Sequence, residues 1–411
     1  MKNHNIAVSA PKAVAFLLTG LIASLLAAPP EYNSNIEEIP NSRVMVVNMQ
    51  TIFDASARNN AKVFPRSIES IAWNSTGTKL FIDCQGVNQY FAIADLSSAT
   101  KGAAKVKMLT HTRDKGNTRL NNANPAFHPG NKYYVFSGQD IGVNEYKRSL
   151  PGYGFCTNLC LADIQSNVYW PLTTYVSTAK SIRGAVMPQF SPDGSKLFWT
   201  ACESKSGDKE IFGKRTLMLG DFAIFSDTPQ LTNAKSIAED QLSGAFAESY
   251  GFSPDGKQLL FAGTRKNVNE WSRMDIALYS LETNKVTFLT TRNDTWDRYA
   301  TFTSTGRKIL WSSSGDYTIP YLGTGGSQWQ NEMLSELWIM NANGSNRWQL
   351  THFNERGHSH YAGCKCFVGM IKWHPTKKNT VAFILHKQHS LNNTSSSIII
   401  AELGNSLIGG K

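Results

Sequence analysis

The stretch Phe252-Ser253-Pro254-Asp255-Gly256-Lys257-Gln258-Leu259-Leu260-Phe261 decides the fold, because variants of it recur along the chain. A close copy runs from Phe190 to Phe198, and looser copies occupy residues 73–81, 127–135, 302–310 and 373–381, which makes six in all. Proline presets φ, aspartate bonds nearby backbone and glycine takes the positive φ of a tight turn, so each copy predicts a β-hairpin. A hairpin cannot bury its faces alone, so the copies indicate a repeat architecture.

A second marker, Leu-Thr, recurs at intervals of about sixty residues. It stands at Leu109-Thr110, Leu172-Thr173, Leu231-Thr232, Leu289-Thr290 and Leu350-Thr351. Each copy is preceded by another strand-like apolar run, so one unit reads as four antiparallel strands, A to D, with the glycine turn joining A to B. Such a unit is a propeller blade. The sequence therefore predicts an all-β protein, a six-bladed β-propeller of four-stranded antiparallel blades.

Only five Leu-Thr endings accompany the six hairpins, which leaves the last blade without its outer strand. The apolar segment Val44-Met45-Val46-Val47 is predicted to supply that strand and to close the ring without a covalent link, which removes two exposed edges. The expected divisions are an N-terminal segment at 1–28, a linker and closing strand at 29–64, the propeller at 65–405 and a tail at 406–411.

Residues 1–28 have the pattern of a targeting segment. Lys2 and Lys12 precede an uncharged apolar run from Ala13 to Ala28, which is short for a membrane-spanning helix. The segment is predicted to be a signal peptide or, if it is not cleaved, an N-terminal anchor. Either case places the protein in the periplasm or outside the cell, with no integral membrane domain beyond that anchor.

The chain is basic, with 41 Lys and Arg against 31 Asp and Glu, and a formal net charge of +10. Only 18% of the residues are charged and 11% are aromatic, which argues against general disorder. A basic field favours acidic partners. The positive residues are scattered rather than gathered in a stripe, so nucleic acid is not a predicted partner.

The repeats resemble those of the TolB-type six-bladed propellers with WD-like repeats. The resemblance covers roughly residues 65–403 and is strongest at the two full Ser-Pro-Asp-Gly turns and at residues 337–345 leading to 350–354. TolB carries an additional N-terminal α/β domain, whereas about 36 residues lie here between the targeting segment and the first blade. The chain is thus similar to TolB without being TolB itself. The resemblance implies a non-catalytic binding or protein-interaction module of the cell envelope.

Long, irregular segments are expected at one end of the ring only. They are the B–C and D–A connections at 139–154, 203–214, 233–247, 313–335 and 352–367. The A–B turns lie at the opposite end. Loop length gathered on one end of a rigid scaffold is typical of a binding surface, so the long-loop end is the predicted functional face.

Charged residues are predicted at the channel mouth on this face. When the blades are aligned on the aromatic residue of strand A, the position four residues earlier holds Glu69, Glu248 and Arg298 in three blades. The predicted ligand-binding residues are these three with Arg183, Asp297 and Tyr361. The competing interpretation is a water-filled pore whose charges form structural ion pairs.

One short segment, residues 357–366, gathers His358, His360, Cys364 and Cys366. Imidazole and thiolate are ligands for zinc or copper, although this spacing matches no standard structural zinc site. His111, His128 and His352 receive no role. In an exported protein, disulfides are the favoured fate of an even number of cysteines, and Cys364 and Cys366 are expected to find partners elsewhere because pairing with each other involves strain. The candidate disulfide cysteines are Cys84, Cys156, Cys160, Cys202, Cys364 and Cys366.

The sequence contains no recognisable catalytic constellation and no Gly-x-Ser-x-Gly motif, so a binding module is favoured over an enzyme and no cofactor is predicted. The predicted partner is an envelope protein or an acidic glycan. The alternative is a propeller enzyme or binding protein acting on an acidic saccharide, similar to the metal-dependent oligogalacturonate lyases, with a divalent metal at His358 and His360.

Overall fold

The computed structural model describes most of the chain beyond residue 38. The described ranges are 39–56, 67–85, 90–97, 105–109, 121–140, 151–166, 168–178, 180–205, 213–268, 270, 272–319, 333–390 and 393–405. All of them belong to the second of two compact units, residues 32–411. The targeting segment, the tail, His111 and most of the expected loops at 139–154, 203–214 and 313–335 lie outside the described residues.

The described part contains six sheets, each of four antiparallel strands. Blade 1 consists of β2 (Ser67–Trp73), β3 (Lys79–Gln85), β4 (Tyr90–Asp95) and β5 (Lys105–Met108). Blade 2 consists of β6 (Asn122–Phe127), β7 (Tyr133–Gln139), β8 (Thr157–Asp163) and β9 (Tyr169–Pro171). Blade 3 consists of β10 (Ser181–Phe190), β11 (Lys196–Lys205), β12 (Lys214–Phe225) and β13 (Thr228–Ile237).

Blades 4 to 6 repeat this plan. Blade 4 consists of β14 (Leu242–Phe252), β15 (Gln258–Arg265), β16 (Asp275–Ser280) and β17 (Val286–Phe288). Blade 5 consists of β18 (Asp297–Phe302), β19 (Lys308–Ser313), β20 (Glu336–Asn341) and β21 (Trp348–Gln349). Blade 6 consists of β22 (Lys365–Trp373), β23 (Thr380–Ser390), β24 (Asn393–Asn405) and the N-terminal β1 (Val44–Ser56). Two short 3-10 helices, η1 (Asn41–Arg43) and η2 (Pro151–Tyr153), complete the elements.

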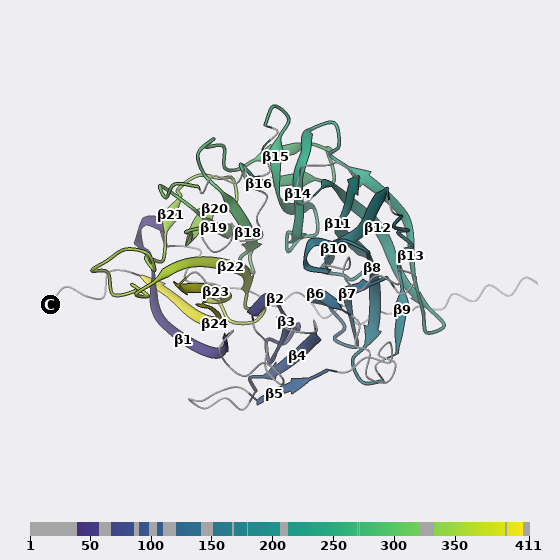
Figure 1. Cartoon of the computed structure of the whole chain (residues 1–411), viewed down its shortest axis with the longest axis horizontal. Coiled ribbons are helices and arrows are strands. Elements are labelled where there is room, and N and C mark those ends of the chain that lie inside the picture. Colours follow the sequence, from purple (N-terminus) through teal and green to yellow (C-terminus); the bar gives the residue numbers. More distant parts are fainter. Residues whose placement is uncertain are drawn as a thin grey trace, which may run out of the picture. The chain divides into compact units, whose positions relative to one another are not determined.

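The innermost strands of the six blades meet around a common centre. They contact one another in the order β2, β6, β10, β14, β18 and β22, and β22 contacts β2 again (Figure 1). This order closes the ring. The prediction of an all-β, six-bladed propeller with four-stranded antiparallel blades is confirmed.

The ring is closed by the N-terminal strand, as predicted. In Figure 1 the purple β1 runs along the yellow β24, and the two strands pair antiparallel from Val44 opposite Asn405 to Ser56 opposite Ser395. The hydroxyl of Ser397 donates a hydrogen bond of 2.5 Å to Asp54 Oδ1 across this pair. The closing strand extends beyond the predicted apolar segment at residues 44–47, because backbone pairing with β24 continues through the mixed polar and apolar residues up to Ser56.

Every innermost strand carries a β-bulge, seen as a break in its register with the second strand of the blade. The breaks lie at Ile68/Ser70, Ala123/Ala126, Val186/Gln189, Ser249/Gly251, Arg298/Thr301 and Val368/Ile371. At three of them a non-glycine residue has positive φ: Asn124, Met187 and Tyr299. A bulge bends a strand and redirects its side chains, so these breaks decide which residues face the centre of the ring.

One expected loop is a pair of strands. Residues 233–247 were predicted to be irregular, but β13 continues to Ile237 and β14 begins at Leu242. The reason is the long neighbour β12, which pairs with residues as far as Ile237 after a bulge near Gly220. Partnership with a long strand holds these polar residues in extended form, which side-chain composition alone does not predict.

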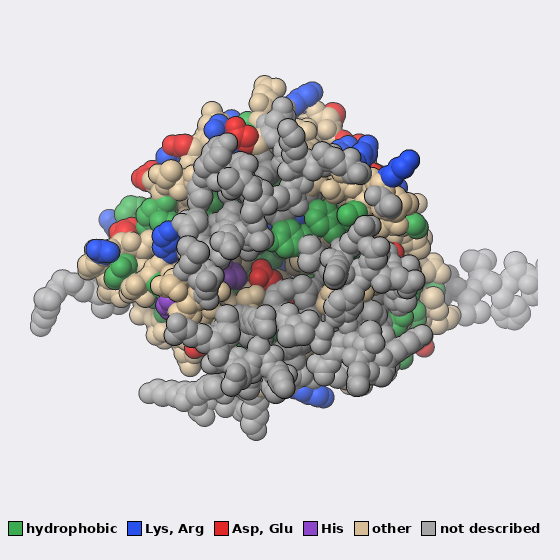
Figure 2. All heavy atoms as spheres, in the orientation of Figure 1, with side chains coloured by type: hydrophobic (Ala, Val, Ile, Leu, Met, Phe, Trp, Pro, Cys, Tyr) green, Lys and Arg blue, Asp and Glu red, His purple; other side chains and the backbone are tan. Residues whose placement is uncertain are grey.

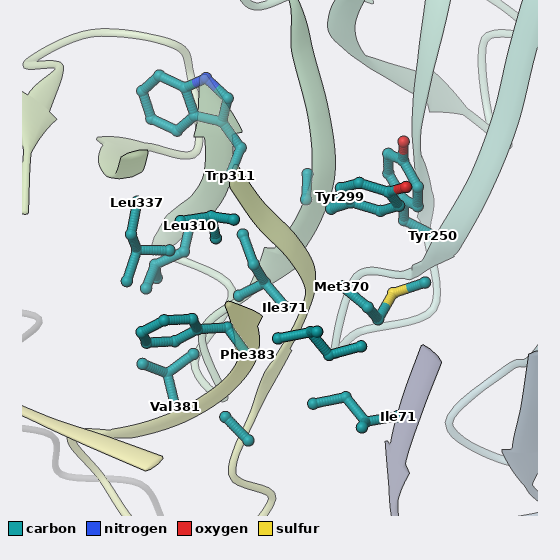
Figure 3. Packing of buried hydrophobic residues seen from close by; sticks show 14 of the residues in the cluster. Ile71, Tyr250, Tyr299, Leu310, Trp311, Leu337, Met370, Ile371, Val381 and Phe383 are labelled. Carbon is teal, nitrogen blue, oxygen red and sulfur yellow. The ribbon is translucent and has the colours of Figure 1, made fainter. Parts of the chain in front are cut away.

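The largest apolar cluster lies where blades 1, 4, 5 and 6 meet. Figure 3 shows Ile71, Met370, Tyr250 and Tyr299, which come from four innermost strands and belong to this cluster. Large side chains such as Trp311 and Phe383 fill the layers behind them and are buried. Burial of such side chains contributes about 1.5–3 kcal/mol each to folding.

The glycine turns lock neighbouring blades together. In the turn that follows Phe252, Ser253 Oγ donates to Asp255 Oδ1 at 2.5 Å, and the backbone N–H of Gly256 donates to Ser253 O at 2.8 Å. Pro254 packs against the next turn, where a Cβ on Gly306 would lie 3.1 Å from Pro254 Cδ. The repeated motif is therefore an inter-blade contact as well as a hairpin turn.

Two of these glycines give a test of the motif. Gly256 has φ +72°, and an added Cβ would have 3.9 Å to its nearest neighbour, whereas at Gly77, φ +68°, it would lie 2.1 Å from His374 Cε1. Gly256→Ala is expected to lower the free energy of unfolding by about 1–2 kcal/mol from backbone strain alone. Gly77→Ala is expected to lower it further, because the His374 ring must also move. Urea denaturation of both variants checks this, and equal losses would show that the turns do not interlock.

Candidate functional site

Glu248 lies at the centre of a buried ion network. Its carboxylate accepts hydrogen bonds from Arg298 Nε at 2.7 Å and Arg298 Nη2 at 2.6 Å, and from the Tyr250 hydroxyl at 2.9 Å. Arg215 Nη1 approaches the same carboxylate at 3.3 Å, and its Nη2 donates to the carbonyl of Tyr153. The three charged side chains come from β14, β18 and β12, so the network joins blades 3, 4 and 5.

Burial and ion pairing have opposite effects on the pKa of Glu248 in this network. The side chains of Glu248 and Arg215 are 0% and 1% exposed, and that of Arg298 is 5% exposed. Burial raises the pKa of Glu248, but the Arg298 and Arg215 guanidinium groups outweigh it and hold the pKa below its ordinary value. The Arg298 guanidinium also lies 4.4 Å from the centre of the Tyr299 ring. Glu248 and Arg298 were predicted at an open channel mouth, and the structure places both in the interior.

Glu69 is the predicted channel residue that remains partly exposed. The Ser67 hydroxyl donates to its Oε1 at 3.1 Å. Burial raises the pKa of Glu69, and Ser67 and the positive charge of Arg298 act in the opposite direction. Glu69 is therefore within electrostatic range of the buried network but is not part of its hydrogen bonds.

The other predicted binding residues lie apart from this network. Arg183 is on blade 3 and pairs at 2.9 Å with Glu203, its register partner on the neighbouring strand, with 53% of its side chain exposed. Asp297 is buried within blade 5, where Trp311 Nε1 donates to it at 2.9 Å, and burial raises its pKa. Tyr361 is exposed on the connection between blades 5 and 6. The structure thus does not bring the six predicted residues into one site.

Lys372 crosses the centre of the ring and was not anticipated. Its ammonium, from β22 in blade 6, donates to Gln189 Oε1 of blade 3 at 3.0 Å and lies 3.5 Å from the carbonyl of Tyr250 in blade 4. Burial lowers the pKa of Lys372 to about 8. The residue directly before the strand A aromatic is uncharged in the other five blades, so the lone charge of Lys372 at this position was the available sequence signal.

Three histidines cluster on the connection between blades 5 and 6. The rings of His352 and His358 have centroids 4.1 Å apart, and those of His358 and His360 are 4.6 Å apart. His352 Nδ1 lies 2.7 Å from Glu355 Oε1. His360 Nδ1 is buried without a partner, and burial, followed by the two neighbouring histidines, lowers the pKa of His360 to about 4. His128 lies elsewhere, against Phe190 and Phe222.

Glu336 organises this connection and escaped the sequence analysis. Its buried carboxylate accepts hydrogen bonds from five donors, all neutral. They are Thr351 Oγ1 at 2.7 Å, the N–H groups of Phe353 and Asn354 at 2.9 Å, Asn354 Nδ2 at 2.9 Å and the Tyr317 hydroxyl at 3.3 Å. The sequence does show an acidic residue, Glu336, at the start of the strand that precedes Leu350-Thr351. The donors that bond to its carboxylate are brought to it only by the fold.

All six cysteines lie within the described residues, and all six are free. Cys84, Cys156, Cys160 and Cys202 are buried at 0–3% exposure. The disulfides favoured by the sequence are thus not formed in this structure. Cys364 and Cys366, which were expected to seek partners elsewhere, face each other with their sulfurs 4.0 Å apart.

A polar pocket of about 140 Å³ lies at the seam between blades 6 and 1. It is lined by Ser67, Glu69, Met333, Lys365, Cys366, Phe367, His386, Lys387, Gln388, Thr394 and Ser395. His386 stacks on Phe367 with ring centroids 5.2 Å apart, and burial lowers its pKa to about 4. Gln388 Oε1 is buried and accepts no hydrogen bond. Figure 2 shows acidic, histidine and hydrophobic side chains meeting near the middle of the displayed face.

Among the residues that the structure describes, no three His, Cys, Asp or Glu side chains are arranged to hold a metal ion. Within the same ranges, no helix has the length and apolar character needed to cross a membrane.

The fold and the site define a six-bladed β-propeller with a charge-filled centre and a polar pocket at its closing seam. No protein-family model matches the chain, and no curated protein matches it. Similar solved structures include TolB from Acinetobacter baumannii. It is 17% identical over 80% of this chain and 63% of that chain, with a TM-score of 0.40. The chain thus spans less than two thirds of that TolB.

Two more of the similar structures are distant in sequence. A protein assigned as TolB from Agrobacterium tumefaciens is 15% identical over 75% of this chain and 88% of that chain, with a TM-score of 0.45. An oligogalacturonate lyase from Vibrio parahaemolyticus is 11% identical over 88% of this chain and 98% of that chain, with a TM-score of 0.44. TolB proteins, whose repeats this sequence resembles, are thus among the structures to which it is similar.

Glu248→Gln tests the buried network. The change leaves two buried guanidinium groups without a counter-charge and is expected to lower the free energy of unfolding at neutral pH by about 3–5 kcal/mol. The folded pKa of Glu248 lies below its ordinary value of 4.5, so the stabilisation is present above that value and is lost as the pH falls through the lowered pKa. The difference in free energy of unfolding between wild type and Glu248→Gln should therefore become smaller at acid pH.

The matched control is Glu203→Gln, which breaks the exposed pair with Arg183. It is expected to cost only about 0–1 kcal/mol. Urea denaturation of both variants at neutral and acid pH gives the comparison. Equal costs for the two variants would mean that the Glu248 network is solvated rather than buried.

Lys372→Met tests the buried ammonium. Because the folded pKa is about 8 and the ordinary value is 10.5, the unfolded chain binds the proton more tightly, and stability rises with pH across that window. In Lys372→Met this rise should be absent. The measurement is the difference in free energy of unfolding between wild type and variant at several pH values from 8 to 10.5, and a constant difference contradicts the burial of Lys372.

Proposed function

We propose that the protein is an exported, non-catalytic binding module of the cell envelope, and that its ligand occupies the seam pocket between blades 6 and 1. One observation carries this proposal. Lys387 and Gln388, whose buried Oε1 accepts no hydrogen bond, line the same pocket as Glu69. These groups lie at the end of the ring that carries the B–C and D–A connections. Export rests on the targeting pattern of residues 1–28 and implies a periplasmic or secreted protein.

The pocket groups favour a particular kind of ligand. Lys387 makes no ion pair within the described part of the chain, so its ammonium is available to a carboxylate. Gln388 Oε1 is a buried acceptor without a donor, which is costly unless a bound group supplies an N–H or O–H. A segment of an envelope protein that places a carboxylate beside backbone N–H groups meets both demands.

The buried network supports a binding role over a catalytic one. Glu248, Arg298 and Arg215 pair with one another in the interior, so their charges stabilise the fold and are buried away from a ligand. The seam pocket combines charged side chains such as Glu69 and Lys387 with uncharged polar ones, and convergence of polar groups in a concave site is typical of recognition.

A second candidate function is recognition or turnover of an acidic saccharide. The observation that favours it is the pair of lysines, Lys365 and Lys387, on the pocket lining, because uronic acids present carboxylates and hydroxyls together. In the enzymatic version a divalent metal at His358 and His360 would assist the chemistry. Metal analysis after supplementation separates this version from the binding module.

Lys387→Glu tests the site. Binding is measured by fluorescence anisotropy with labelled acidic peptides and with labelled oligogalacturonate, which separates the two ligand classes. The wild-type chain is expected to bind one class, and reversal of the pocket charge should weaken that binding by about tenfold or more. Lys285→Glu, which makes the same charge change at an exposed site in blade 4, should bind like wild type. Equal affinity of wild type and Lys387→Glu would remove the pocket from consideration.

A further inference from the structure

Cys364 and Cys366 form a facing pair of thiols. Their sulfurs are 4.0 Å apart, and Cys366 Sγ also lies 3.6 Å from the carbonyl oxygen of Cys364. The Cα atoms of residues two apart are about 6.6 Å from each other in an extended chain and closer where the chain bends, as it does at Cys364. This spacing falls within the Cα separation of about 4.4–6.8 Å found in disulfides, so a bond between the two needs only local movement.

The two cysteines differ in freedom to move. The backbone of Cys366 is held on both sides by one residue, because its N–H donates to Asn354 Oδ1 at 2.8 Å and its carbonyl accepts from Asn354 Nδ2 at 3.0 Å. Cys364 precedes β22 and follows Gly363, which has φ +75° and no atom within 4 Å of a built Cβ. Cys364 can therefore approach Cys366 while the strand stays in place.

The two thiols also differ in accessibility. Cys364 is partly exposed, whereas Cys366 is 1% exposed. Burial, followed by the neighbouring Cys364, raises the pKa of Cys366, and the Lys387 ammonium opposes the rise. The exposed sulfur is the one that an incoming reagent meets first, and the buried sulfur stands behind it. This is the arrangement of an attacking and a resolving cysteine.

We propose that Cys364 and Cys366 are a thiol–disulfide exchange site that reacts with low-molecular-mass disulfides. The Cys364 thiolate attacks one sulfur of the disulfide R–S–S–R, the S–S bond breaks, and R–S⁻ leaves and takes up a proton. The Cys366 thiol then loses its proton and attacks Cys364 Sγ, which expels the second R–S⁻, and this group is protonated in turn. Two cysteine thiols are oxidised to one disulfide, and R–S–S–R is reduced to two R–SH.

The inference does not depend on the proposed ligand. Cys366 contributes to the lining of the seam pocket, so the disulfide would form in the pocket wall beside Lys387. The exchange chemistry needs only the two sulfurs and an accessible disulfide. It can therefore hold if the binding proposal fails, and the assay contains no ligand for the pocket.

The experiment treats the folded, full chain with oxidised glutathione, quenches with acid, alkylates the remaining thiols and digests with trypsin. Cleavage after Arg356, Lys365 and Lys372 separates the cysteines into peptides 357–365 and 366–372, which stay together only if the disulfide has formed. The linked pair is the expected product, and reduced glutathione should release it. The buried Cys84, Cys156, Cys160 and Cys202 are internal controls and should remain thiols.

Two variants separate the roles. Cys366→Ser should stop at a mixed disulfide of Cys364 with glutathione, and Cys364→Ser should give neither the adduct nor the linked peptides. Because Cys364 is partly exposed, Cys364→Ser is expected to fold even if the buried substitution is harmful. The proposal is overturned if the wild-type pair stays reduced like the four controls, or if wild type stops at the glutathione adduct without linking the peptides.

Discussion

The constraint on which the structure depends is the closure of the ring at one seam. Blade 6 has three strands from the C-terminal part of the chain and takes its fourth, β1, from the N-terminal part. Across the same seam the N–H of Ile68 in blade 1 donates to Ser396 Oγ in blade 6 at 2.8 Å. Without β1, β24 would expose an edge of unpaired backbone groups, which is a liability in a sheet protein. The seam pocket is lined by the start of β2, β22 and β24, the end of β23 and Met333, so it exists only where blades 6 and 1 meet.

The centre of the ring explains why the pocket lies to the side. Glu248 and its two arginines bridge blades 3, 4 and 5, and Lys372 bridges blades 6, 3 and 4. Removing one partner of such a buried pair leaves an uncompensated charge, so the network holds these blades in one arrangement. Because Glu248 pairs with its two arginines and Lys372 bonds to uncharged groups, these charges are taken up in the interior, and other polar groups line the seam pocket.

The sequence predicted the fold well because the fold depends on short local motifs. Each Ser-Pro-Asp-Gly turn and each Leu-Thr ending marks a blade, and the missing sixth ending correctly pointed to Val44 as the start of the closing strand. The site was predicted less well. Alignment on the strand A aromatic found Glu248 and Arg298, but Arg215 belongs to strand C and has no place in that alignment. The bulge lies at a similar place in every innermost strand, but it shifts by one residue between some blades and so changes which residues face inward at equivalent positions.

The connection at residues 352–364 shows why the cysteines were misjudged. Its sequence is rich in histidine and glycine and reads as a loop, yet Glu336 anchors it through the N–H groups of Phe353 and Asn354. Asn354 in turn clamps the backbone of Cys366, so a carboxylate with only neutral donors fixes the position of one thiol. A buried polar network of this kind holds one geometry when all its members are satisfied. The strain expected for two cysteines separated by one residue is therefore reduced, because Cys364 lies just outside the strand and follows the left-handed Gly363, which joins it to the preceding connection.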